Sequence, residues 1–266
     1  MFSAGNLLDV LQELYPPEFA LQDDNFGLQI GSLSAQIRSV LISLDLDEKS
    51  IALAKKKSCD AIVTHHPIWR RGPKMLNEDD ASVSRALSAA RAGLVVINAH
   101  TNADFAPGGI CDALSELLSL NTVISLYEEK RVPIGRIGRV RPTKWKNYRA
   151  RLNRLFGKTV RASGTVPNII EIVALCSGSG SDLLEKAYES GADIFVTGDV
   201  KYHTARDAET LGKKRIGKEG RGFLLVDAGH YETEKIFVDI TAKGLKRTAS
   251  KLRIEKSIVK SPFILL

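Results

Sequence analysis

The feature that most constrains the fold is a repeated pattern of short apolar runs separated by helix-like segments. The runs are rich in β-branched residues and bounded by turn residues, which is typical of strands buried on both faces. They cover residues 40–44, 61–63, 94–97, 169–175, 194–196 and 223–226. Helices are predicted between them, over 48–58, 79–93, 109–119, 181–191 and 201–212. This alternation predicts an α/β fold with largely parallel, mixed sheets.

Several of the predicted helices end in glycine, which favours a helix C′ position at Gly93, Gly191 and Gly212. The stretch 126–168 breaks the alternation, because it is basic and contains three prolines. It predicts a hairpin-like insertion followed by a helix near 145–156. We therefore expect two linked α/β lobes, the first formed by residues 1–124 plus 223–266 and the second by residues 125–222.

Composition excludes several classes of protein. The 266 residues are 44% hydrophobic and 26% charged, which is typical of a globular chain and not of a disordered one. No stretch reaches the roughly 20 apolar residues that span a bilayer, so no membrane association is expected. The start of the chain lacks the pattern of a secretory signal. The three cysteines are far apart and form no CxxC motif, which favours buried thiols and a cytoplasmic location.

The net charge of +7 has two interpretations. Basic residues gather over 136–158, where Trp145, Tyr148 and Phe156 are interleaved with them. Such a stretch is compatible with nucleic-acid binding, but a solvated helix face plus a loop is favoured, because no recognised DNA- or RNA-binding signature accompanies the charge. The charge would also attract an anionic substrate such as a nucleotide.

The five histidines lie in four polar clusters, and each cluster follows an apolar run. His65 and His66 follow the second run, and His100 follows the third with Asp104 four residues later. The remaining two clusters contain His203 and His230. In open α/β sheets, binding sites form at the carboxyl ends of the strands. The placement of the histidines therefore predicts a functional site.

Imidazole and carboxylate ligands without thiolate favour Zn, Mn, Fe, Ni or Co over Ca or Mg. His230 and Glu234 are four residues apart, so they share one face if the segment is helical. His65 and His66 are adjacent and can reach two different ions. The donors outnumber what one four-coordinate ion needs, which favours a two-metal centre with Asp104 as a bridging carboxylate. For His100 and His203, direct ligation and contact with a ligand or the substrate both remain open.

One Gly-rich turn, residues 176–182, follows a predicted strand and precedes a predicted helix. Its backbone amides are suited to a phosphate group. The alternative is a tight turn in which Ser181 or Asp182 is the helix N-cap.

Five ordered blocks of the chain resemble the NGG-one-interacting-factor-three-like family, whose members are often labelled GTP cyclohydrolase I type 2 homolog. The similarity covers nearly the whole chain. The blocks are Asp24 to Gly31, Thr64 to Pro67, His100 to Asp104, Thr197 to His203, and Gly229 to Glu234.

The resemblance implies two divalent metal ions per chain. The ligands that it implies are His65, His66, Asp104, His230 and Glu234. It also places His100 beside these ligands and implies assembly as a toroidal homohexamer. We expect the metal site at the carboxyl ends of the strands between the two lobes, lined by His100 and His203, to which we assign catalytic roles.

The activity implied by the family label is hydrolysis of a nucleotide-like substrate, in which water attacks the guanine ring of GTP and formate is released. Two alternatives stay open. One is a non-enzymatic hexameric ring that binds nucleic acid or protein partners, and the other is a metal-handling factor.

Overall fold

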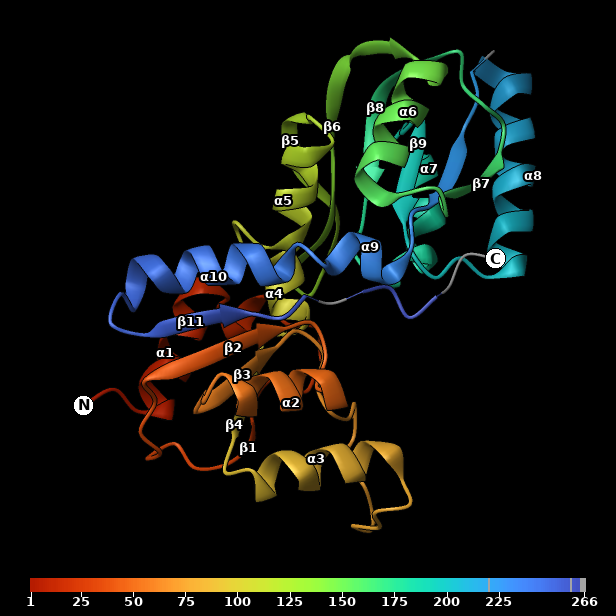
Figure 1. The fold of residues 1–266 in the computed structure, drawn as a ribbon. Coiled ribbons are helices and arrows are strands. Elements are labelled where there is room, and N and C mark those ends of the chain that lie inside the picture. Colours follow the sequence, from red (N-terminus) through yellow and green to blue (C-terminus); the bar gives the residue numbers. More distant parts are fainter. Residues whose placement is uncertain (220, 259, 264–266) are drawn as a thin grey trace. The chain divides into compact units, whose positions relative to one another are not determined.

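The computed structural model describes residues 1–219, 221–258 and 260–263 (Figure 1). Its contacts group the chain into two compact units. Unit 1 comprises Met1–Gly109 and Lys235–Lys260, and unit 2 comprises Ile110–Glu234 and Ser261–Leu266. The lobe boundaries expected near residues 125 and 223 stay a prediction about where independently folding domains begin and end.

Unit 1 is built on a five-stranded sheet with the strand order β1-β4-β3-β2-β11. Strand β1 pairs antiparallel with β4, whereas the other described pairings of this sheet are parallel. The strands β2, β3 and β4 are buried along their whole length, as continuous apolar runs require. The bounds are β1 Gly27–Ile30, β2 Ser39–Ser43, β3 Ala61–Thr64, β4 Val95–Asn98 and β11 Arg253–Lys256.

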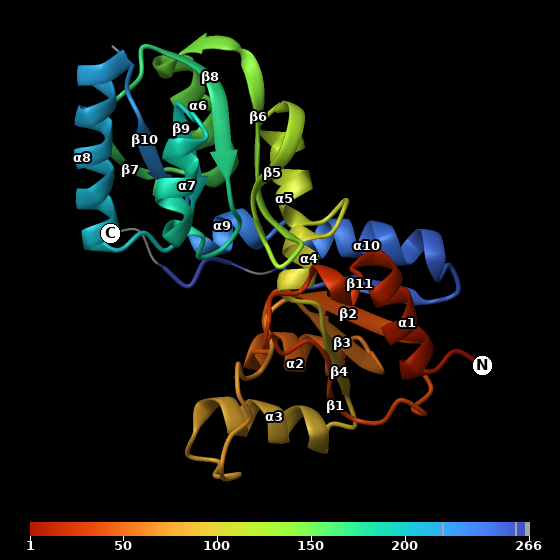
Figure 2. The ribbon, with the colours of Figure 1, turned by 180° about the vertical axis from the view of Figure 1, so that it is seen from behind.

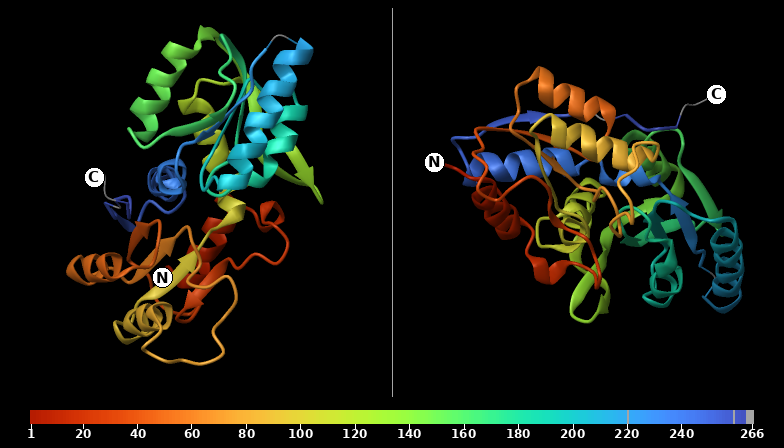
Figure 3. Two further views of the ribbon diagram at one scale, coloured as in Figure 1. Left: turned by 90° about the vertical axis from the view of Figure 1, so that its right-hand side faces the viewer. Right: turned by 90° about the horizontal axis from the view of Figure 1, so that it is seen from below.

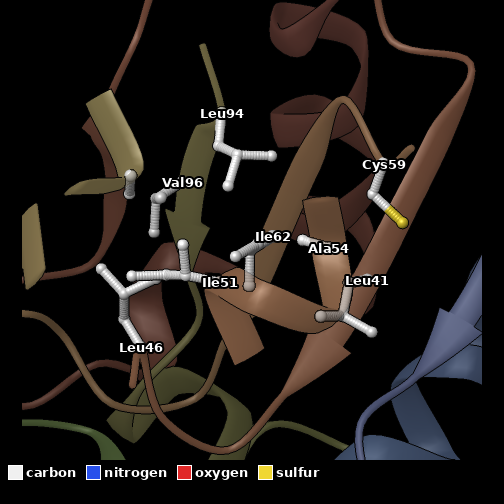
Figure 4. Close-up of a cluster of buried hydrophobic side chains, with 9 residues drawn as sticks. Leu41, Leu46, Ile51, Ala54, Cys59, Ile62, Leu94 and Val96 are labelled. Atoms are coloured by element: carbon white, nitrogen blue, oxygen red, sulfur yellow. The ribbon is translucent and has the colours of Figure 1, made fainter. Parts of the chain in front are cut away.

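Helices cover both faces of the unit 1 sheet, with α2 and α3 on one face and α1 and α10 on the other (Figures 1 and 2). Side chains alternate along a strand, so Leu41, Ile62 and Val96, which are aligned in register, all point to the face under α2 and α3. There they meet Ile51 of α2 and Ala89 of α3 in one buried cluster (Figure 4). Each such aliphatic side chain contributes about 1.5–3 kcal/mol by its burial. The bounds are α1 Ala4–Leu14, α2 Glu48–Lys56, α3 Ala81–Arg91, α4 Thr101–Phe105 and α10 Phe237–Thr248, with a short 3-10 helix at Pro17–Phe19.

Unit 2 contains a six-stranded mixed sheet with the order β5-β6-β8-β9-β10-β7. The central strands β8, β9 and β10 are parallel, and the flanking pairings are antiparallel. The long hairpin of β5 and β6 forms one edge. The bounds are β5 Asn121–Glu129, β6 Val132–Lys144, β7 Arg161–Gly164, β8 Ile169–Leu175, β9 Ile194–Thr197 and β10 Leu224–Asp227.

The helices of unit 2 also lie on both faces of their sheet. Helices α5 and α6 cover one face and α7 and α8 the other (Figure 3, left). The short helix α9 follows β10 directly. The bounds are α5 Ile110–Leu117, α6 Trp145–Phe156, α7 Leu184–Glu189, α8 Tyr202–Glu219 and α9 His230–Glu234, with a 3-10 turn at Ser181–Leu183 before α7.

The α/β class and the two mixed sheets confirm the prediction. Each predicted strand is present, and the helix expected near 145–156 is α6. The three cysteines are free and buried, as expected. The sheet of unit 2 contains antiparallel pairings on both sides of its parallel strands, so it is less parallel than the prediction of largely parallel sheets. Over the described residues, the structure contains no helix with the length and apolar character needed to cross a membrane.

Two of the three predicted glycine helix ends are confirmed. Gly93 and Gly191 follow α3 and α7 with φ of +68° and +82°. The third prediction is wrong, because Gly212 lies inside α8. A Cβ on Gly212 would lie 2.6 Å from the backbone nitrogen of Thr165. This glycine is therefore needed for close packing of the helix against its neighbour.

Candidate metal-binding site

The carboxyl ends of three parallel strands position the histidines of unit 1. Ser43 of β2, Thr64 of β3 and Asn98 of β4 are aligned in register. The residues that follow these strands therefore emerge at the same edge of the sheet. The backbone N–H groups of His65 and His66 both donate to the carbonyl of Leu44, at 3.1 and 3.0 Å. These bonds fix the backbone positions from which the two imidazole side chains extend.

The side chains of His65, His66 and His100 form what we call the histidine cluster. One ring nitrogen from each lies within 4.8 Å of the others. His65 is fully buried, and its ring centroid is 5.1 Å from that of Phe237. The structure thus brings together three of the five histidines within unit 1 alone, including His100, whose role the sequence left open.

Asp104 joins this cluster from helix α4. The first residue of α4 follows His100, so Asp104 lies one helical turn beyond it. Its Oδ2 atom is 3.7 Å from Nε2 of His65, and the carboxylate is buried. Two ligands of one ion, each bound at about 2.0–2.2 Å, can be at most about 4 Å apart. The separation fits a shared metal ion and is too long for a hydrogen bond.

Each imidazole of the cluster is oriented through its Nδ1 atom. Nδ1 of His65 is 2.9 Å from the carbonyl oxygen of Ala99. A carbonyl only accepts, so the proton of the neutral ring is on Nδ1 and the lone pair is on Nε2. The carboxylates of Asp45 and Asp24 hold Nδ1 of His66 and His100, at 2.8 and 2.6 Å. Metal-binding histidines are characteristically held in this way.

The carboxylate that orients His100 is itself strongly stabilised. Burial raises the pKa of Asp24, but hydrogen bonds and charge interaction with His100 and hydrogen bonds from Thr101 outweigh it and lower the pKa to about 2. The backbone N–H of Thr101 donates to Asp24 at 3.0 Å. Asp24 is therefore ionised at neutral pH and acts only as an acceptor.

Unit 2 contains a second group of donors on helix α9, which we call the α9 pair: His230 and Glu234. Nε2 of His230 is 3.0 Å from Oε2 of Glu234. Nδ1 of the same ring is 2.7 Å from Oδ2 of Asp199. A neutral imidazole has one proton, so two carboxylates cannot both receive one from it. One of the two nitrogen atoms of His230 therefore faces its carboxylate without a proton of the neutral ring between them. A second proton on the ring, or a metal ion bound by both atoms, makes that contact favourable.

Two backbone amides of the Gly-rich turn are bonded to side-chain hydroxyl groups of unit 2, one on α9 and one at the end of β9. The N–H of Gly178 donates to the Thr233 hydroxyl, and that of Gly180 donates to the Thr197 hydroxyl, both at 3.0 Å. A Cβ on Gly178 would lie 2.0 Å from Oε1 of Glu234. The turn is thus tight because the carboxylate of Glu234 lies against it.

The N-cap expected at Ser181 or Asp182 is wrong. The 3-10 turn begins at Ser181 with Gly180 in the cap position, and no side chain caps it.

His203 differs from the other histidines. It lies on the exposed first turn of α8, and its ring contacts that of Tyr202 at 5.4 Å. It belongs to none of the close groups of potential ligands found among the described residues. Its catalytic role stays a prediction.

Sequence reasoning assigned no role to the three aspartates that orient the rings: Asp24, Asp45 and Asp199. Asp45 and Asp199 follow the strands β2 and β9, so the carboxyl-end rule that selected the histidines would have selected them too.

The fold and these donor groups define a class: two-unit α/β proteins with imidazole–carboxylate groups able to hold metal ions. The chain belongs to the Duf34/NIF3 (NGG1p interacting factor 3) family, whose model matches residues 2–263. This confirms the family suggested by the ordered blocks.

Two similar relatives carry the name GTP cyclohydrolase 1 type 2 homolog. The protein from Lactococcus lactis is 31% identical over 257 residues, which cover 95% of each chain. The protein from Clostridium perfringens is 28% identical over 268 residues, covering 97% of this chain and 98% of the relative. Among solved structures, a Bacillus cereus protein related to NIF3 has the same fold, with a TM-score of 0.88, 21% identity and 99% coverage of each chain.

Proposed function

We propose that this protein is a metal-dependent hydrolase that binds two divalent ions and acts on a nucleotide or a related heterocycle. The observation that carries the proposal is the common orientation of the imidazoles. The four rings of His65, His66, His100 and His230 each have Nδ1 held by an oxygen atom. In the three rings assigned as ligands, those of His65, His66 and His230, this leaves the lone pair of Nε2 for a metal ion, and in His100 it leaves the same lone pair to accept a proton.

In this proposal the ligands are His65, His66, Asp104, His230 and Glu234, which serve one two-metal centre as the family resemblance implies. The ligand types favour Zn, Mn, Fe, Ni or Co. When bound, such ions polarise substrate oxygens and lower the pKa of water.

The chain's own contribution to the chemistry includes His100. With its Nδ1 proton donated to the ionised Asp24, its Nε2 accepts a proton at the edge of the histidine cluster. A histidine whose orientation is fixed by a carboxylate is a common arrangement for a general base. We assign the general-base role to His100 on this ground.

The substrate class rests on two supports. Relatives about 30% identical to this chain are named as homologues of a GTP cyclohydrolase, so GTP with formate release is the first reaction to test. The net charge of +7 favours the encounter with an anionic substrate. We also propose a homohexameric ring, which the mass of the protein in solution tests directly.

The decisive experiment combines elemental analysis of the purified full chain with an unbiased screen for consumed metabolites. We expect two ions per chain, one consumed compound, and loss of both metal and turnover in Glu234→Gln. The matched control is Glu232→Gln on the same helix, which should keep both.

Failure of the metal-loaded protein to consume GTP or any compound of a nucleotide panel would overturn the hydrolase proposal. Fast transfer of bound metal to an acceptor without turnover would favour a metal-handling factor instead.

A further inference from the structure

A cavity of about 510 Å³ lies in unit 2, apart from the donors described above. Its walls come from the residues after α5, the end of β6 and helix α6. We call it the arginine cavity, because its lining includes Arg141, Arg151 and Arg154. It lies in the basic, aromatic stretch 136–158, which the proposed hydrolase function does not use.

The charge of this cavity is unbalanced. Three arginines are among its lining residues, and no aspartate or glutamate is. Arg151 donates to the carbonyl of Leu118 at 3.0 Å, so it also caps the C-terminal end of α5. Within the described residues, the side chains of Arg141 and Arg154 make no ion pair or hydrogen bond. Like charges held together are unfavourable, and an anion placed among them relieves the repulsion.

A buried polar group adds a second, independent observation. Tyr148 lines the cavity, and the residue is only 2% exposed. Its hydroxyl oxygen is buried without a hydrogen-bond partner in the described part of the chain. Buried hydroxyl groups are normally paired, because leaving one unpaired is costly.

The chemistry of Tyr148 suits it to be a donor. Burial raises the pKa of the hydroxyl, and the nearby positive charge of Arg151 offsets this only in part. The hydroxyl therefore stays protonated near neutral pH. The hydroxyl of Tyr148, near Arg151, is therefore an O–H donor that has no acceptor among the described residues, and an anionic oxygen that reaches it would supply one.

We propose that the arginine cavity binds the phosphate or pyrophosphate group of a small molecule. Arginine forks match phosphate oxygens in geometry and charge, and three of them suit a group carrying two or more negative charges. The cavity volume is within the range of small-molecule sites. This inference goes beyond the proposed hydrolase and does not depend on the metal ligands.

The test is titration of the full chain with inorganic pyrophosphate, followed by calorimetry. We expect Arg154→Ala and Arg141→Ala each to weaken binding about tenfold or more, as loss of a charge-assisted hydrogen bond does. Arg151 is a poor test because it also caps α5. The matched control is Arg149→Ala, which removes the same charge from α6 outside the lining; Arg149 is exposed, as Arg141 and Arg154 are, so the variants differ in position and not in exposure. It should change the affinity less than about threefold, since its charge is not among the lining residues and acts on the anion only through screened solvent.

Further arms separate the explanations. Tyr148→Phe should weaken binding by a smaller factor while the circular dichroism spectrum is unchanged. His65→Ala should bind pyrophosphate as the wild type does, which distinguishes this site from the metal site. GTP should compete with pyrophosphate, whereas guanosine should not.

Two outcomes would overturn the proposal. One is the absence of pyrophosphate binding at millimolar concentration. The other is equal loss in Arg149→Ala and Arg154→Ala, which would show a diffuse basic surface. A single-stranded oligonucleotide tests the remaining alternative. If Arg149→Ala and Arg154→Ala weaken its binding equally, and pyrophosphate does not compete with it, the surface is a nucleic-acid interface and not a small-molecule site.

Discussion

The two units share one local arrangement of two parallel strands followed by a short helix. They differ in the potential metal ligands that this arrangement carries. In unit 1 the strand β3 begins after Asp60 and ends at Thr64, and in unit 2 the strand β9 begins after Asp193 and ends at Thr197. In each unit the next strand, β4 or β10, is parallel to it. The two segments share few identical residues, so the sequence alone does not reveal the repeat.

The similarity continues to the donors. Ala99 donates its N–H to the carbonyl of Thr64 at 3.0 Å, and Ala228 donates to that of Thr197 at 2.7 Å. A histidine then precedes or begins a five-residue helix, α4 or α9. A carboxylate follows that histidine four residues later in both units, as Asp104 or Glu234. Each unit therefore builds a His-x₃-carboxylate group from a strand end and one helical turn.

The difference lies after the first of the two strands. Unit 1 places His65 and His66 there, whereas unit 2 places Gly198 and Asp199. A Cβ on Gly198 would lie 2.6 Å from the backbone nitrogen of His230, so no side chain fits. The same scaffold thus gives three imidazoles in unit 1 and one in unit 2. Unit 1 therefore supplies mainly nitrogen ligands, whereas unit 2 supplies one nitrogen ligand and one carboxylate ligand.

The largest effect is expected from removing a buried imidazole. His65→Ala should weaken metal binding by more than the 10–100-fold typical for loss of an outer hydrogen-bonding partner. His230, whose side chain is one-third exposed, should lose less when replaced by Ala, because water can replace it as a ligand. Calorimetric titration with Zn²⁺ or Mn²⁺ measures both. Full metal content in His65→Ala would contradict this comparison. The control is His203→Ala, which should keep its full metal content.

The next largest effect, on the free energy of unfolding, is expected at the aspartates that directly precede β3 and β9. Asp193 accepts the N–H groups of Glu171 and Ile172, both at 2.8 Å, and pairs with Arg221. Its side chain is 1% exposed. Asp193→Asn should destabilise the protein by about 3 kcal/mol, since the amide keeps only one acceptor oxygen and leaves either the buried N–H donors or Arg221 without a partner.

Asp60 holds the same position in unit 1 and accepts the N–H groups of Arg38 and Ser39, at 2.8 and 2.9 Å. Its side chain is 24% exposed. Asp60→Asn should therefore lower the free energy of unfolding by only about 1 kcal/mol. Urea denaturation of both variants gives the comparison. Equal losses would show that burial does not separate the two positions.

A smaller effect is expected from the carboxylates that orient His100 and His230. Asp24 is 8% exposed in its side chain and Asp199 is 51% exposed. Asp24→Asn should reduce turnover towards 100-fold, because Asp24 orients the general base His100, and Asp199→Asn should reduce metal affinity towards tenfold, because Asp199 orients the ligand His230. A turnover assay measures the first effect and metal titration the second. A larger loss in Asp199→Asn would mean that unit 2 contains the more constrained ring.

These comparisons also show what the sequence can and cannot predict. The buried strands and the cluster of His65, His66 and His100 were predictable, because apolar runs mark buried strands and the carboxyl ends of parallel strands converge. Strand β11 was not predictable in this way, because its sequence Arg253–Lys256 is charged and lies at a sheet edge. Helices α1 and α10 have apolar faces with a helical period, which a search for strand-like runs passes over.

The partners of the donors were harder to predict than the donors. Asp24 reaches His100 across 76 residues of sequence, and no local pattern encodes that contact. The arginine cavity is harder still, since its walls depend on how α5, β6 and α6 pack. Composition indicated the charge of the stretch 136–158 but not that three arginines share one cavity with a buried tyrosine.

The smallest effect is the pH dependence of Asp60, and it tests whether its hydrogen bonds act through charge. Burial raises the pKa of Asp60, but the hydrogen bonds from Arg38 and Ser39 outweigh it and lower the pKa below its ordinary value. A lowered folded-state pKa stabilises the protein at every pH above the ordinary value of the group. That stabilisation is lost as the pH falls through the folded-state value.

The difference in unfolding free energy between wild type and Asp60→Asn should therefore be constant from pH 7 to about pH 5 and shrink below about pH 4. Other carboxylates titrate in the same range, but they act equally on both proteins and cancel in the difference. Guanidinium denaturation at stepped pH, with the ionic strength held constant, measures it. A difference that stays constant down to pH 2 would mean that the hydrogen-bond geometry of Asp60, and not its charge, holds the start of β3 against β2.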